Sequence, residues 1–286
     1  MSTSFKLISL DAEGAVELRH AGGGLLLRYV YRPQTPLTES PRPYAHPVQT
    51  LRGDLLTLFR PNDHPWHHAL SFTLTSVSGH NFWGGGSYRK EDGYKYRGDQ
   101  GTQEHEAWIE KSASRLAHTL LWRVGAGERI LLREERSLSF SQVSDHAWSL
   151  RWQGSLKNVS GETLQLGHYH STHGLTGSHY SGLQFRAARA LLDDHGDATI
   201  RIVGEGDLQG EAAVHGAPLS WMEWYGQKDE SLHRVSIRFD NAGQRLHGFV
   251  RRNYPLASFP LNYAEDQALA PEQTLSVDHT LTFSDL

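Results

Sequence analysis

The sequence predicts an all-β protein folded as a large antiparallel β sandwich. Three observations support this fold class. Apolar runs of strand length alternate with polar residues along most of the 286-residue chain, and turn-forming segments rich in Gly and Asn separate them. A third observation is that few windows carry apolar residues at helical spacing without an interrupting Gly or Pro. We therefore expect no helix longer than two or three turns, and a sandwich in place of a parallel α/β fold.

The expected strands follow one another from the N-terminus to the C-terminus. Alternation is clearest at 129–140 and 147–156, where Trp148, Leu150 and Trp152 fall on one face, and we expect Trp148 and Trp152 in the core. The other strand-like runs lie at 4–10, 24–31, 54–59, 69–77, 118–124, 199–203, 234–239, 246–252 and 274–283.

Turns and linkers give the domain organisation. Gly and Asn at 21–24, 158–162 and 240–244 supply positive φ angles for hairpins. The proline-rich segment 32–47 predicts an irregular crossing between strands. Because the chain contains no internal repeat and no proline-rich linker, we predict a single domain over residues 1–286.

Composition excludes several functional classes. The formal net charge of -4 comes from scattered charges and offers no basic stripe for nucleic acid. The absence of cysteine excludes disulfides, thiolate metal sites and a cysteine nucleophile. We expect a soluble, cytoplasmic protein with no membrane partner, because the N-terminus lacks a signal pattern and no window approaches the roughly 18 apolar residues that a span requires. Composition leaves the oligomeric state open.

The stretch RPNDHPWHHALSF, residues 60–72, gathers one aspartate and three histidines. Pro65 places the cluster in a loop, and strand geometry after it points His67 and His68 to opposite faces, so only one of them joins His64 easily. An imidazole pair beside a carboxylate can ligate a divalent metal or transfer protons, with Asp63 orienting a ring nitrogen. These groups can equally hold the loop in place by hydrogen bonds.

A second histidine set lies in GHYHSTHGL, residues 167–175. If this segment is a strand, His168 and His170 share one face, which is a common way to present two ligands together. A divalent metal is the one cofactor that the sequence suggests, without establishing it. Its candidate ligands are His46, His64, His68 and His105.

Aromatic residues indicate a carbohydrate ligand. NFWGGGSY, residues 81–88, combines Trp83 with a glycine run that lets backbone and ring approach a ligand closely. Trp and Tyr rings pack on sugar C–H groups while charged side chains bind the hydroxyls. Trp83 and Trp221 can alternatively belong to the core.

Several of these motifs together resemble a bacterial family known as PmoA-like, or methane oxygenase PmoA, which is also described as a domain of unknown function. The resemblance covers roughly residues 20–284 and implies a β sandwich similar to galactose mutarotase with a role in sugar catabolism. A methane monooxygenase subunit spans a membrane, and this sequence has no such segment, so we interpret the name as a misnomer. The matching residues are Arg42, Pro43, Tyr44, His46 and Pro47, then Arg60, Pro61, Asp63, His64, Pro65, His67 and His68, then Gly79, Phe82, Trp83 and Gly84, and later His105, Glu135, Gly182, Leu183, Arg186, Trp221, Phe249, Arg251 and Pro255.

The leading hypothesis is a carbohydrate-active enzyme of the epimerase, lyase or hydrolase type that uses histidine acid/base chemistry. Its candidate catalytic residues are His64, His68, His168, His170 and Glu135. Its candidate substrate-binding residues are His46, Asp63, Trp83, Arg186 and Arg251. Two alternatives remain open at this point: a metal-dependent hydrolase, lyase or soluble oxygenase, and a sugar-binding module without catalysis.

Overall fold

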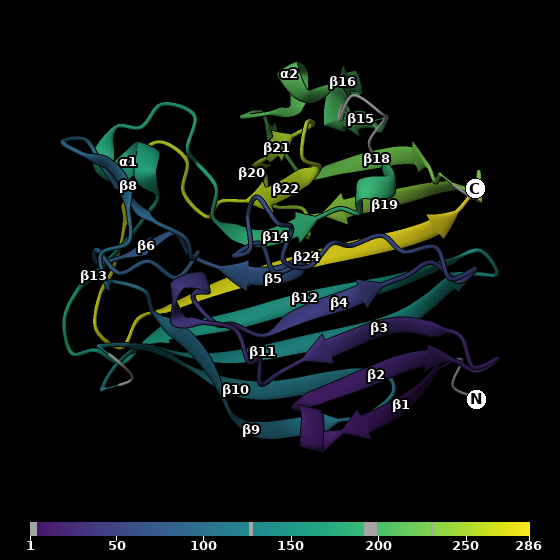
Figure 1. Ribbon diagram of the computed structural model, residues 1–286, viewed down its shortest axis with the longest axis horizontal. Helices are drawn as coiled ribbons and strands as arrows, with labels where there is room; N and C mark the ends of the chain where they lie inside the picture. The colour runs from purple at the N-terminus through teal and green to yellow at the C-terminus, as the bar shows by residue number, and fades with distance from the viewer. Residues whose placement is uncertain (1–4, 126–127, 192–198, 230) are drawn as a thin grey trace.

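The protein is an antiparallel β sandwich, as predicted. The computed structural model describes residues 5–125, 128–191, 199–229 and 231–286, and in these ranges two large sheets overlie one another (Figure 1). All pairings between the named strands are antiparallel in the described residues. The helices are short, and none in these ranges is long and apolar enough to cross a membrane.

One sheet has eight strands in the described part of the chain. In spatial order they are β1 (Phe5–Leu10), β2 (Ala15–His20), β3 (Leu25–Val30), β4 (Tyr44–Val48), β5 (Leu70–Thr73), β14 (Gly182–Arg186), β22 (Leu256–Phe259) and β21 (Phe249–Arg251).

The other sheet has nine strands among the described residues. In spatial order they are β16 (Leu208–Gln209), β15 (Arg201–Gly204), β18 (Trp221–Gln227), β19 (Arg234–Asp240), β24 (Thr274–Asp285), β12 (Ala147–Asn158), β11 (Arg129–Ser144), β10 (Arg115–Val124) and β9 (Thr102–Lys111).

Smaller elements complete the described fold. Three small sheets pair β23 (Gln267–Leu269), β13 (Leu164–Gly167) and β6 (Ser76–Val77), then β17 (Pro218–Leu219) with β20 (Leu246–His247), then β7 (Ser87–Arg89) with β8 (Gly93–Lys95). The helices are α1 (Tyr169–His173) and α2 (Glu211–Val214), with 3-10 turns at Asp11–Glu13, Leu37–Glu39, Arg189–Leu191 and Glu205–Asp207.

The hydrophobic core lies between the two large sheets. Tyr29 on β3 packs edge-on against Trp152 on β12, with ring centroids 6.2 Å apart, and Phe72 on β5 meets Trp122 on β10 at the same separation. Trp148 and Trp152 are fully buried, which confirms their predicted place. Aromatic packing across the sheets therefore contributes to the hydrophobic core together with many Leu, Val and Ile side chains.

Three local expectations were wrong. Residues 54–59 form isolated bridges at Leu55, Thr57 and Phe59, because this run crosses strand ends and does not lie along a sheet. The HxH segment is not a strand: His168 caps the N-terminus of α1. Apolar alternation also did not predict strands β2, β4, β9 and β18, because polar and charged residues interrupt it there.

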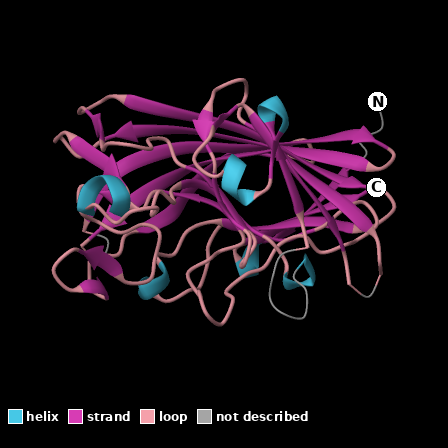
Figure 2. Ribbon diagram, turned by 90° about the horizontal axis from the view of Figure 1, so that it is seen from above, coloured by secondary structure: helices cyan, strands magenta, loops and turns pink. Residues whose placement is uncertain are grey.

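The outer face of the eight-stranded sheet is polar at one end. On β14, Leu183 and Phe185 face the core, so Gln184 and Arg186 point to the opposite side. Leu256 is the cross-strand partner of Arg186 and shares this outer face. Most connecting loops gather on one side of the strands (Figure 2). The outer end of β14, β22 and β21 therefore forms the floor over which these loops can build a pocket.

Candidate functional site

A pocket of about 380 Å³ lies over this floor and is lined mainly by aromatic side chains. Leu256 and Arg251 come from β22 and β21, and two loops and the chain before β14 supply the walls. The aromatic and imidazole lining residues are His64, Trp66, His67, Trp83, Tyr94, Tyr180, Phe249 and Tyr254. Such a cleft, with several rings and a few polar groups, is typical of small-molecule sites.

Two consecutive turns shape the histidine loop. The backbone N–H of His64 donates to the carbonyl of Pro61 at 3.0 Å, and the N–H of His67 donates to the carbonyl of His64 at 2.9 Å. Pro65 occupies the second position of the latter turn, where its fixed φ is favourable. As a result, the rings of His64 and His67 stack, with centroids 4.7 Å apart and an angle of 24° between their planes.

His64 and Asp63 form the dyad that the sequence suggested. Nδ1 of His64 lies 3.0 Å from Oδ2 of Asp63, and the ring also stacks on Tyr254 at 5.4 Å. Burial raises the pKa of Asp63, but the hydrogen bond from His64, a backbone hydrogen bond and the charges of His64 and Arg186 together outweigh it, so the pKa lies below its usual value. Because an ionised carboxylate only accepts, Nδ1 carries the proton and Nε2 keeps a lone pair.

His67 is the loop histidine that joins His64, and the sequence analysis did not include it among the catalytic candidates. Its side chain is buried, and burial followed by the nearby charges of His64 and Arg186 lowers its pKa well below the usual value. Nδ1 of His67 has no hydrogen-bond partner among the described residues. His67 is therefore a neutral ring with an unused nitrogen beside the pocket.

The glycine loop packs closely against the histidine loop. The side-chain oxygen of Asn81 accepts hydrogen bonds from the backbone N–H groups of Trp83 and Gly84, at 2.9 and 2.8 Å. Gly84 has a φ of +98°, and a Cβ there would lie 2.7 Å from Cβ of Trp66. Only glycine suits this position, and its absence of a side chain lets Trp66 and Trp83 line the same pocket.

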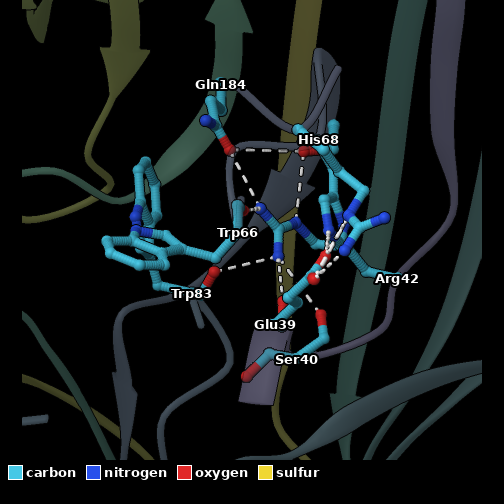
Figure 3. A network of polar contacts seen from close by, with 9 residues as sticks. Glu39, Ser40, Arg42, Trp66, His68, Trp83 and Gln184 are labelled. Atoms are coloured by element: carbon cyan, nitrogen blue, oxygen red, sulfur yellow. Dashed lines mark hydrogen bonds and ion pairs between the residues drawn. The ribbon is translucent and has the colours of Figure 1, made fainter. Parts of the chain in front are cut away.

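Arg42 fixes both loops from behind the pocket (Figure 3). Its Nη1 donates to the carbonyl of Trp83 at 2.9 Å, and its Nη2 donates to the carbonyl of Trp66 at 2.8 Å. Burial lowers the pKa of Arg42 to about 9, so the guanidinium stays charged at neutral pH. The remaining acceptors are the carbonyls of Glu39 and Ser40 and the side chains of Ser71 and Gln184.

His68 belongs to this supporting network and does not line the pocket. It is fully buried, and its Nε2 donates to Oε2 of Glu39 at 3.1 Å, while Arg60 binds the same carboxylate. Burial is the main cause that lowers the pKa of His68 to about 3. His68 therefore lies apart from the pocket that His64 lines, because period-two geometry turns it away from His64, toward a buried carboxylate.

Arg186 packs against two lining residues, Tyr254 and Leu256, and is not itself part of the pocket lining. Its side chain is 2% exposed, its guanidinium carbon is 5.3 Å from the centre of the Tyr254 ring, and burial lowers its pKa to about 10. Neither Nε nor Nη1 has a hydrogen-bond partner among the described residues. The arrangement leaves a buried cation with unused donors beside the pocket.

Arg251 forms part of the pocket wall and is already engaged. Nη2 donates to the carbonyl of Gly177 at 3.0 Å, and Nη1 donates to the carbonyl of Val250 at 3.1 Å. Its guanidinium carbon lies 4.3 Å from the centre of the Phe249 ring, and the carboxylate of Glu211 is 3.9 Å from Nη1. These contacts hold the Arg251 charge at the rim.

The second histidine set forms a separate cluster. Nδ1 of His168 accepts a hydrogen bond from the backbone N–H of Ser171 at 3.1 Å, and Nε2 contacts the carbonyl of Asn262 at 3.2 Å. His170 packs on His179 with ring centroids 4.0 Å apart, and neither His168 nor His170 lines the pocket. Because the start of α1 uses His168 as a cap, the expected meeting with His64 is corrected.

Glu135 is not the carboxylate partner of the site. It lies on the exposed face of β11, and its neighbour Glu134 is the buried carboxylate. Glu134 pairs with Arg136 at 2.7 Å and accepts from the indole N–H of Trp122 at 2.8 Å. Strand alternation explains the difference, because adjacent residues face opposite sides and the sequence pattern did not reveal which one faces inward.

The four candidate metal ligands are dispersed. His46 contacts the hydroxyl of Thr57 at 2.9 Å, His105 contacts His118 at 2.9 Å, and the partners of His64 and His68 are given above. Within the described ranges, no group of three or more His, Asp or Glu side chains has a geometry that could hold a metal. The spacing of these histidines along the sequence could not show whether they occupy four separate places or share one site.

His46 instead lines a larger hollow of about 650 Å³. Burial lowers the pKa of His46 to about 4, so the ring is neutral. Asp54, Arg189 and Lys228 also line this hollow, and its described lining contains no Trp, Tyr or Phe. It therefore lacks the rings that pack on sugars, and the smaller aromatic pocket is the better candidate site.

The comparisons identify the family. A family model described as a family of unknown function, DUF6807, matches residues 15–285, so the chain belongs to that family. The match agrees with the expected domain of unknown function, whereas the PmoA name stays a prediction. No curated protein matches the chain.

Two solved structures are similar over most of this chain. The GH36 α-galactosidase AgaB from Geobacillus stearothermophilus matches with a TM-score of 0.44 and 12% identity, covering 98% of this chain and 41% of that one. The 4-α-glucanotransferase from Thermococcus litoralis matches with a TM-score of 0.37 and 10% identity, covering 100% of this chain and 40% of that one. The chain thus spans about two fifths of either structure, and the similarity transfers no activity.

Proposed function

We propose that the aromatic pocket binds a small carbohydrate and that the protein acts on it by acid/base chemistry centred on His64. The observation that carries this proposal is the Asp63–His64 dyad in the wall of a pocket with Trp, Tyr and Phe rings. Indole and phenol rings pack on the C–H faces of sugars, and their polar edges with nearby charged groups bind hydroxyls. The described lining supplies both kinds of contact.

The dyad favours His64 as the base. With its Nδ1–H held by Asp63, the ring presents Nε2 as a proton acceptor, and the carboxylate stabilises the imidazolium that forms. His67 stacks on this ring and is neutral because of its burial, so it adds no second positive charge against the protonated His64. These features fit proton abstraction from a sugar carbon, as epimerases and lyases require, or from an attacking water molecule, as hydrolases require.

Proton transfer can be tested before the natural sugar is known. We expect the protein, incubated in D₂O with a panel of aldoses, ketoses and sugar acids, to exchange a carbon-bound proton or to form a product in at least one sample, seen by ¹H NMR. His64→Gln keeps a polar side chain but removes the base, and should lower this rate at least about 100-fold, the usual range for a general base. His146→Gln changes an exposed histidine outside the pocket and serves as the matched control.

The same samples separate catalysis from binding. Saturation-transfer NMR on the panel reports ligand contact independently of turnover. If sugars bind to the wild type but neither exchange nor product appears, the enzyme proposal is wrong and a non-catalytic sugar-binding module replaces it. If exchange continues at the wild-type rate in His64→Gln, His64 is not the base.

A further inference from the structure

Arg186 is a buried cation whose donors remain unused. Its side chain is 2% exposed, and Nε and Nη1 are both inaccessible to solvent and without a hydrogen-bond partner in the described part of the chain. Burying a charged group without partners is costly, and a buried guanidinium normally donates to carboxylates or carbonyls. Packing alone therefore does not account for the burial of the Arg186 guanidinium.

The position of Arg186 points to the pocket. It follows Gln184 on the outer side of β14, and its cross-strand partner Leu256 lines the pocket floor. The ring of Tyr254, another lining residue, lies 5.3 Å from the guanidinium carbon, and the charge of Arg186 acts on His67 in the wall. These contacts place the guanidinium against the Tyr254 and Leu256 part of the pocket, although Arg186 is not itself a lining residue.

We infer that the ligand of this pocket carries a carboxylate, which the guanidinium of Arg186 binds, so the substrate class is a sugar acid. The inference rests on the proposed function and specifies its substrate. A planar guanidinium fork matches the two oxygens of a carboxylate, and such charge-assisted bonds are among the strongest polar contacts in proteins.

The local charges favour a singly charged group over a phosphate. Arg251 at the rim already donates to two backbone carbonyls and lies near Glu211, and Asp63 brings a negative charge to the histidine loop. The charge of Asp63 acts on Arg186, but Arg186 forms no ion pair among the described residues, so its guanidinium remains to balance one negative charge. A phosphate dianion would meet Asp63 with half of its charge unbalanced.

The test compares acids with their neutral parents. Dissociation constants would be measured for D-glucuronate against D-glucose, D-galacturonate against D-galactose, and D-glucose 6-phosphate. We expect an acid to bind at least about 10-fold more tightly than its parent, as hydrogen bonds to charged groups imply. In Arg186→Met this preference should fall to below about 3-fold while the neutral sugar binds as before. Arg186→Lys, which keeps the charge but loses the fork, should lie between the two.

A matched arginine controls for a general effect of charge. Arg201 makes the same kind of contact, 4.6 Å above the ring of Tyr225, but is exposed and belongs to the other sheet. Arg201→Met should keep the full preference for acids. Circular dichroism of both variants would show that each is folded before binding is compared.

The outcomes separate the two proposals. If neutral sugars bind as tightly as the acids, or the preference survives in Arg186→Met, the carboxylate inference is overturned while the sugar site stands. Tighter binding of the phosphate ester than of either acid also overturns it. If no sugar of any kind binds, the proposed function and this inference are both wrong.

Discussion

Two buried arginines lie on the same side of the eight-stranded sheet, and they differ in what their donors contact. All three nitrogens of Arg42 donate hydrogen bonds, and their acceptors include the backbone carbonyls of Trp66 and Trp83 in the two loops. Two nitrogens of Arg186 donate to nothing in the described chain. Both side chains are at most 2% exposed, so burial alone does not separate them.

The difference teaches how to distinguish a supporting residue from a binding residue. A satisfied guanidinium fixes the geometry of its partners, and its charge is compensated by the dipoles that it contacts. An unsatisfied one raises the free energy of the folded state, and such a cost persists chiefly where function requires it. We therefore interpret Arg42 as a supporting residue and Arg186 as a binding residue, and the two are expected to respond oppositely to substitution.

The largest expected effect is the loss of Arg42. In Arg42→Met the carbonyls of Trp66 and Trp83 lose a buried donor, and the two loops lose their common anchor. Removing one partner of a buried charged network costs about 3 to 5 kcal/mol, so we expect that decrease in the free energy of unfolding, measured by urea titration. A decrease of less than about 1 kcal/mol would show that Arg42 does not hold the loops.

The sequence predicted the local structure around the pocket better than the roles of the individual residues. Turn chemistry and strand alternation are local, so the histidine loop, the glycine loop and the opposite directions of His67 and His68 followed from residues close in the chain. Which histidine joins His64 depends on which face of β5 is turned to the core, and that is decided by packing against distant strands. His68 was chosen although His67 lines the pocket.

Residues joined only by the fold were the hardest to predict. Glu39 and Arg42 contact the histidine loop from more than twenty residues away, and Tyr254 reaches it from the opposite end of the chain. The motif resemblance pointed to Arg42, but no spacing rule connects it to two carbonyls. The expected positions of Glu135, His168 and His170 were wrong for the same reason. Each was judged from a single strand or segment, without the neighbours that the fold brings to it.

The supporting network also predicts sensitivity to acid. The pKa of His68 is about 3 in the folded protein, because of burial, against an ordinary value of 6.5. Below pH 6.5 the unfolded chain binds a proton that the folded protein does not, so stability is lost as the pH falls from 6.5 toward 3. At pH 5 this histidine alone should lower the free energy of unfolding by about 2 kcal/mol relative to pH 8.

Paired urea titrations at pH 8 and pH 5 measure this contribution. His68→Gln removes the ionisation, and its loss of stability between the two pH values should be smaller than that of the wild type by about 2 kcal/mol. His146→Gln, at an exposed position, should keep the wild-type difference. An equal pH dependence in all three proteins would mean that His68 is not buried as a neutral ring.

The smallest expected change, and the sharpest contrast with Arg42, is that of Arg186→Met. Methionine has a similar length and leaves no charge to desolvate, while the loss of the contact with Tyr254 offsets part of the gain. We therefore expect the free energy of unfolding to rise by about 1 kcal/mol in urea titrations without ligand, at the same pH and salt as for Arg42→Met. A fall as large as that of Arg42→Met would show that the two arginines support the fold alike. A rise would mean that the folded protein keeps Arg186 at a cost to its own stability, as expected of a residue that is retained for a ligand.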